Sequence, residues 1–217
     1  MNYPPSPWSL NGFAYQTFQL ASIDEARRHV PKELSIIPIL PGRTASGIYI
    51  AKYEDNSDLS YSELILIDAL VRYKYYVGFW CSHIFVDHPL SVLGGRKIWK
   101  LPKKLADFNW NVNIGSMKDD INLLKVIINN DDIFFNCNYQ SKLGIKLKFT
   151  IPLITYNQSK IFFSKMKISS RIYFSKMDIF WGDAKIKKNL KVNESNISGC
   201  FYENLNIQAL APKIIEL

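Results

Sequence analysis

Apolar residues follow one another along this chain in runs that favour β-strands over helices. Residues 13–21 and 47–54 are rich in aromatic and β-branched side chains, as strands are. Residues 63–73 and 76–87 are almost continuously apolar, a pattern typical of strands that are buried on both faces. The first half of the chain therefore predicts at least four strands, two of them deep in a closed barrel.

The second half continues the strand pattern with lysines between the apolar positions. Five further runs predict strands: residues 121–130, 132–140, 144–156, 160–168 and 171–186. Helix is expected in three short places: over 22–30 behind an N-cap serine, in a turn just after Pro102, and in the tail. The predicted fold class is mainly β (α+β): an antiparallel β-barrel or double sheet with one or two short helices. We find no linker, so residues 1–217 are expected to form a single domain.

The amino-acid composition and the net charge exclude some classes of function. The 217 residues are 47% hydrophobic and carry a net charge of +8. The lysines are scattered among apolar residues and form no basic patch, so we do not expect a nucleic-acid partner. No apolar run reaches the roughly 18 residues that a membrane span needs, and the first residues do not resemble a secretory signal. Three widely spaced cysteines suggest a reducing compartment and no zinc site, so a cytoplasmic protein is expected.

The stretch GGRKIWKLPKKLADF, residues 94–108, raises a chemical question because it sets Lys103 beside Lys104 among apolar neighbours. A lysine attacks a carbonyl only as the free amine. At an ordinary pKa of about 10.4, only about 0.04% of lysine is neutral at pH 7, and bringing that pKa to about 7 costs about 5 kcal/mol. A second ammonium about 10 Å away supplies about 1.7 kcal/mol at an effective dielectric near 20. Burial has to supply the rest, and a surface turn remains the alternative.

The same stretch resembles the signature of the acetoacetate decarboxylase family, in which a glycine-arginine pair precedes a proline and two lysines. The segments PWSLNGFAYQTF, DEARRHVPKEL, PGRTASGIYIAKY, YSELILI and GFWCSHIFVD follow the family's order, so the resemblance covers residues 3–110 well. It implies that Lys103 forms a Schiff base, that Lys104 is the neighbouring cation, and that Glu63 is an active-site carboxylate. It also implies an oligomeric enzyme that uses no metal or organic cofactor.

Arg96 matches the family arginine seven residues before the Schiff-base lysine. It is interpreted either as a ligand for a substrate carboxylate or as a support for the lysine loop. Phe79 and Trp99 are expected to line a substrate pocket or to pack in the core. His83 and His88 are interpreted as solvated or hydrogen-bonded side chains, in preference to metal ligands.

Two charged positions of the family's decarboxylase site are missing here. The family's first-strand arginine falls near Gly12, and its second glutamate falls near Ile48. The first half also resembles the plant neoxanthin-deficient proteins, which are linked to carotenoid formation. This chain keeps the lysine pair, which the plant proteins do not, so the predicted function is a Schiff-base-forming lyase that acts through Lys103 on a small keto acid. The expected chemistry is decarboxylation of a β-keto acid such as acetoacetate, or aldol or dehydration chemistry on a 2-oxo acid. The alternative is a family member that binds or isomerises an apolar ligand such as a carotenoid.

Overall fold

A computed structural model describes residues 2–111, 122–128, 131–139, 143–181 and 197–216, and these residues are mostly in β-strands. The parts of the predicted strands at 121, 129–130, 140 and 182–186 lie outside the described residues. The two helices are α1 (Ile23–Ala26) and α2 (Pro89–Ile98). The strands of the first half are β1 (Trp8–Thr17), β2 (Gln19–Ser22), β3 (Ser35–Ile36), β4 (Arg43–Tyr53), β5 (Tyr61–Tyr73), β6 (Tyr76–Val86), β7 (Lys103–Leu105) and β8 (Asp107–Asn111). Those of the second half are β9 (Asn122–Ile128), β10 (Asp131–Tyr139), β11 (Ile145–Asn157), β12 (Lys160–Trp181), β13 (Ile197–Ala209) and β14 (Lys213–Glu216).

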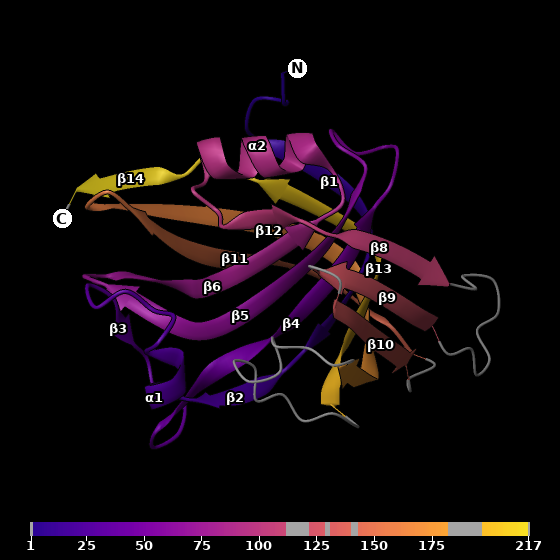
Figure 1. The fold of residues 1–217 in the computed structure, drawn as a ribbon, viewed down its shortest axis with the longest axis horizontal. Coiled ribbons are helices and arrows are strands. Elements are labelled where there is room, and N and C mark those ends of the chain that lie inside the picture. The colour runs from indigo at the N-terminus through magenta and orange to yellow at the C-terminus, as the bar shows by residue number, and fades with distance from the viewer. Residues whose placement is uncertain (1, 112–121, 129–130, 140–142, 182–196, 217) are drawn as a thin grey trace.

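Seven strands close into a ring. The hydrogen-bonded order is β11-β6-β5-β4-β1-β13-β12, and β11 pairs again with β12 (Figure 1). The join between β11 and β6 is the thinnest part of the ring, a parallel bridge between Leu153 and Phe79. Strands β10, β9 and β8 extend the sheet from β12 and fold back across the outside of the ring. The expected mainly β fold with one or two short helices is confirmed, but the sheet is mixed and not purely antiparallel, because β6 pairs in parallel with β7 and β11.

Alternating side chains fill two cores, one on each face of the ring strands. On β4, Tyr49 and Ala51 point into the ring, whereas Ile48 and Ile50 pack outward. The outward side chains meet Val126 and other residues of β9 and β10. Both faces of these strands are therefore covered, which is why their sequence is apolar at nearly every position.

Four local predictions are corrected by the structure. The tail, expected to be helical, is the strand β14, which pairs with β12. The helix expected over 22–30 has only the four residues of α1, and the following residues form turns. Lys103 begins the short strand β7, so no helix follows Pro102; the helix of this region is α2, which precedes the proline. The separate strands expected at 160–168 and 171–186 are one long strand, β12, because both halves pair continuously with β11, β13 or β10. No described helix has the length and hydropathy needed to cross a lipid bilayer.

Candidate active site

The ring encloses a cavity of about 110 Å³ whose wall is largely aliphatic and aromatic. Its apolar lining comes from six of the seven ring strands, all but β4, and from the segment after α2: Trp8, Leu10, Ile65, Ile67, Phe79, Cys81, Ile84, Trp99, Leu101, Ile151, Leu153, Met166, Ile168, Ile207 and Ala209. Six polar side chains also reach it: Gln16, Tyr49, Tyr53, Tyr61, Glu63 and Lys103. The few polar groups in this apolar wall mark the cavity as the candidate site.

Lys103 is the only described lysine or arginine on this wall, and it is almost completely buried, with 3% of its surface exposed. Its Nζ lies 2.8 Å from Oε1 of Glu63. It also donates to Oγ of Ser91 at 3.0 Å and to the hydroxyl of Tyr61 at 3.3 Å. The Tyr61 ring lies beneath the amine, with its centroid 4.9 Å from Nζ. The amine is therefore held by a carboxylate, two hydroxyls and an aromatic face.

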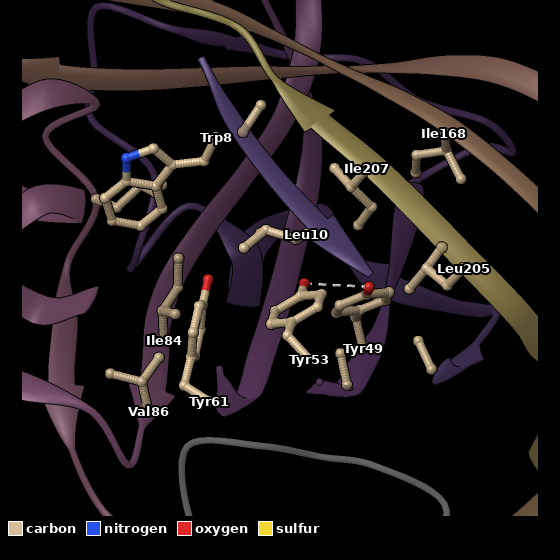
Figure 2. Close-up of a cluster of buried hydrophobic side chains, with 14 of the residues drawn as sticks. Trp8, Leu10, Tyr49, Tyr53, Tyr61, Ile84, Val86, Ile168, Leu205 and Ile207 are labelled. Carbon is tan, nitrogen blue, oxygen red and sulfur yellow. Dashed lines mark hydrogen bonds between the residues drawn. The ribbon is translucent and has the colours of Figure 1, made fainter. Parts of the chain in front are cut away.

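A chain of phenols continues from the other oxygen of Glu63. The Tyr53 hydroxyl donates to Oε2 at 3.0 Å, and the Tyr49 hydroxyl lies 3.3 Å from that of Tyr53 (Figure 2). Burial is the main cause that raises the pKa of Tyr49, Tyr53 and Tyr61 well above the ordinary value for a phenol. These hydroxyls therefore stay protonated at neutral pH and act as donors toward the carboxylate or a ligand.

Two helical glycines let the lysine and its aromatic neighbour approach α2. A Cβ on Gly95 would lie 2.6 Å from Cδ of Lys103, and a Cβ on Gly94 would lie 2.4 Å from the Trp8 ring. Any larger residue at either position would displace the side chain that packs there. The glycine pair in the sequence GGRK is thus explained by close packing against the cavity wall.

The structure separates the two lysines of the predicted pair. They are neighbours on β7, and adjacent strand residues point to opposite faces. Lys103 is buried, whereas Lys104 is exposed. Arg96 is also exposed and does not line the cavity; its Nε donates to the backbone oxygen of Lys103 at 2.7 Å. Arg96 therefore anchors the backbone that carries the buried amine.

Phe79 and Trp99, the two aromatic residues predicted for a pocket, both line the cavity. Trp99 is also tightly fixed. Its Nε1 donates to the backbone oxygen of Leu210 at 2.7 Å, and its own backbone oxygen accepts from Thr155 at 2.6 Å. Its ring meets that of Trp8 edge to face, with centroids 4.9 Å apart. These contacts hold the segment after α2 against the ring and close this end of the cavity.

The sequence analysis missed four polar wall residues, Gln16, Tyr49, Tyr53 and Tyr61. Their signal is register: Glu63 pairs with Ala51 on β4, so residues two positions from Ala51 share its face. That reasoning finds Tyr49 and Tyr53 once the pairing is known. The same register turns Ile48 away from the cavity, into the outer core.

His83, His88 and Cys81 have hydrogen-bonding or packing roles that do not require a metal ion or a nucleophile. His88 accepts the backbone N–H of Leu90 at 3.2 Å and caps α2, and Nδ1 of His83 lies 2.6 Å from Oγ of Ser82. Among the described residues, no group of three or more His, Cys, Asp or Glu side chains is placed to hold a metal ion. Burial, helped by nearby carboxylates, raises the pKa of the Cys81 thiol well above its usual value. Cys81 is therefore a poor nucleophile at neutral pH, although it lines the cavity.

The fold agrees with what the chain matches. Residues 2–153 match the family of acetoacetate decarboxylase, and the chain belongs to this family. The structure of acetoacetate decarboxylase from Legionella pneumophila aligns with a TM-score of 0.70 at 15% identity, over 99% of this chain and 89% of the other. The enduracididine biosynthesis enzyme MppR, in complex with the condensation product of pyruvate and imidazole 4-carboxaldehyde, aligns with a TM-score of 0.71 at 13% identity, over 98% and 90% of the two chains.

Curated relatives with higher identity come from plants. Protein NEOXANTHIN-DEFICIENT 1 of Solanum lycopersicum is 29% identical over 109 residues, which are 50% of this chain and 37% of the tomato protein. The Arabidopsis thaliana protein of the same name is 28% identical over 110 residues, 51% of this chain and 39% of its own length. The match thus covers well under half of either plant protein.

Proposed function

We propose that this protein is a carbon–carbon lyase that binds a β-keto acid as a Schiff base on Lys103. The observation that supports this most is the placement of one amine, buried on the wall of an apolar cavity and 2.8 Å from the Glu63 carboxylate. A buried lysine does not contribute to the solvation of the protein surface, and burying its charge costs free energy. Covalent chemistry on a carbonyl compound accounts for that cost.

Glu63 gives the amine a way to lose its proton without releasing it to water. Moving one proton from Nζ to Oε1 turns a buried ion pair into a neutral amine and a neutral acid. An apolar cavity opposes separated charge, so it favours this exchange more than water does. The Tyr53 hydroxyl, 3.0 Å from the other oxygen, holds the carboxyl group in position during the transfer.

The reaction then proceeds in four balanced steps. The free amine of Lys103 adds to the ketone carbon, protonated Glu63 gives its proton to the ketone oxygen, and that oxygen leaves as water, which yields an iminium ion. The bond to the carboxylate carbon breaks, carbon dioxide departs, and the electron pair enters the iminium to form an enamine. A proton taken up from solvent and delivered through Glu63 adds to the enamine carbon and gives an iminium again. Water adds to this iminium and releases the shorter ketone together with the protonated amine, which pairs once more with the Glu63 carboxylate.

The charge of the cavity supports decarboxylation in particular. Glu63 and Lys103 compensate each other, and no described arginine lines the wall, so a bound carboxylate meets little compensating charge. Loss of carbon dioxide removes that charge from an apolar environment. Gly12, where the family arginine was expected, has no side chain, and a Cβ there would lie 2.0 Å from the backbone oxygen of Lys52.

The largely apolar wall also favours a second candidate function. A cavity lined by aliphatic and aromatic side chains from all seven ring strands suits an apolar ligand such as a carotenoid. The similarity to the plant proteins supports the same reading. In that case Lys103 and Glu63 form a structural ion pair, and no adduct with a ketone is expected.

Reductive trapping distinguishes the two functions. The protein is incubated with acetoacetate or acetylacetone, reduced with borohydride, and digested for mass spectrometry. The lyase predicts a secondary amine at Lys103 and release of carbon dioxide from acetoacetate. Both are lost in Lys103→Ala and kept in Lys97→Ala, which changes an exposed lysine of α2. The lyase function would be refuted, in favour of a protein that binds an apolar ligand, if the correctly folded protein gave no adduct with either compound but retained an extracted or added carotenoid.

A further inference from the structure

A second polar group lies in the same cavity, on strands β1 and β13. Gln16 is 91% buried and lines the cavity wall. It pairs directly with Tyr49 across β1 and β4, so the two side chains share the inner face. Its Oε1 accepts a hydrogen bond of 2.8 Å from the Tyr202 hydroxyl. Tyr202 comes from β13, on the other side of β1 from β4.

The amide nitrogen of Gln16 is left without a partner. Within the described part of the chain, Tyr202 is the only hydrogen-bond partner of this side chain. Its side chain lies on the cavity wall, and the amide nitrogen is not among the fully enclosed unpaired atoms of the described residues, so it stays accessible to a group bound in the cavity. The Tyr49 hydroxyl beside it donates to Tyr53, whose own proton goes to Glu63, so the Tyr49 oxygen can still accept a bond.

We infer that Gln16 and Tyr49 form a subsite for an uncharged oxygen of the substrate, such as a hydroxyl, a carbonyl or an ether, and that Tyr202 holds the Gln16 amide in position for it. The three groups are neutral: burial raises the pKa of both phenols, and an amide carries no charge. A carboxylate placed there would lose its hydration without gaining a counter-ion, which is why the subsite selects an uncharged acceptor. This inference rests on the proposed function, because it describes the far end of the compound that reacts with Lys103.

Both hydrogen-bonded groups and apolar side chains line the wall between the subsite and the reactive amine. The hydrogen-bonded path from Tyr49 to Lys103 passes through Tyr53 and then Glu63. Leu10 and Ile207, which Figure 2 shows together with Tyr49 and Tyr53, supply apolar surface to the same cavity. The substrate class is therefore a carbonyl compound whose apolar body carries an uncharged oxygen at a distance from the reacting carbon.

A length series of aldehydes tests the subsite without knowing the natural substrate. Straight-chain ω-hydroxyaldehydes and the matching unsubstituted aldehydes, of four to ten carbons, are trapped on the protein with cyanoborohydride below saturation. One neutral hydrogen bond is worth about three- to tenfold in the trapping rate. The hydroxy compound should exceed its partner by this factor at one or two chain lengths only. Gln16→Met and Tyr202→Phe should each remove the preference, measured as the ratio of the two trapping rates within the same variant.

Tyr173→Phe is the matched control, because its hydroxyl bonds Glu203 at 3.0 Å and does not line the cavity. Equal trapping of both series at every length would overturn the subsite while the Schiff-base function stands. A preference that survives in both variants, with unfolding temperatures unchanged, would overturn it as well. The absence of any adduct at Lys103 with every aldehyde would refute the proposed function itself, and the subsite would fall with it.

Discussion

The ion pair between Lys103 and Glu63 makes a quantitative prediction about stability. The two side chains are only 4% and 6% exposed, and their charged atoms lie 2.8 Å apart. Glu63→Gln removes the negative charge but keeps an oxygen for the Tyr53 hydroxyl to donate to. Lys103→Met removes the positive charge and keeps an unbranched apolar chain beside Gly95. Each variant thus leaves one buried group without its partner.

Breaking one side of a buried pair typically costs about 3–5 kcal/mol, since the remaining charge stays desolvated. Removing both partners leaves no buried charge at all. The double variant should therefore be destabilised by clearly less than the two single variants together. We expect a coupling free energy of about 2 kcal/mol or more, which is within the range measured for contacting groups.

Urea unfolding of the four proteins, followed by tryptophan fluorescence at pH 7, measures this coupling. The chain contains a matched control in the pair formed by Lys160 and Glu216. Their charged atoms are 3.0 Å apart, but the side chains are 49% and 79% exposed. An exposed pair contributes about 0–1 kcal/mol, so the same cycle on Lys160→Met and Glu216→Gln should give a coupling below about 1 kcal/mol.

Equal couplings in the two cycles would refute the reasoning. Such a result would mean that water reaches Lys103 as freely as it reaches Lys160, and that the cavity does not isolate the amine. The proposal that Glu63 takes the proton of Lys103 in an apolar environment would then lose its physical basis.

Three further predictions follow from the site. Glycine-to-alanine changes inside helices usually stabilise a protein by about 0.5–1 kcal/mol, but Gly95→Ala places a Cβ 2.6 Å from the Lys103 side chain. The rate of adduct formation at Lys103 should therefore fall at least tenfold in this variant, with an unchanged circular dichroism spectrum. A wild-type rate would contradict the close packing of Gly95 against Lys103. Lys104→Gln should change the rate of adduct formation at Lys103 by less than about threefold, because two charges about 10 Å apart in water interact by only about 0.4 kcal/mol. A tenfold loss of rate would show that the charge of Lys104 controls the reactivity of the Lys103 amine. Burial raises the pKa of the Tyr49 and Tyr202 phenols, so the stability that these neutral groups provide is complete below the unfolded pKa of about 10 and is lost as the pH rises above that value. Tyr49→Phe should therefore make the fall in unfolding free energy above pH 10 shallower. An unchanged slope of unfolding free energy against pH, measured by urea titrations, would argue against a buried neutral phenol at this position.

The strand content could be predicted from the sequence, and the sequence also singled out the lysine to which we assign the chemistry, for separate physical reasons. Continuous apolar runs such as residues 63–73 report a strand that is buried on both faces, whatever covers those faces. Lys103 stands out because an amine among apolar residues after a proline is chemically unusual, and because its surroundings resemble one family. The helix after Pro102 was predicted wrongly, since a proline also fits the residue before an edge strand such as β7.

Pairing across strands decided the rest of the site. The sequence places Lys104 next to Lys103, and only the strand conformation of β7 sends the two side chains to opposite faces. Tyr49 and Gln16 lie 33 positions apart in the sequence and become neighbours through the register of β1 and β4. The chain by itself therefore determined which amine could react and how much of the protein is sheet. The tertiary structure alone decided which groups surround that amine, because side chains from seven strands meet only after the ring has closed.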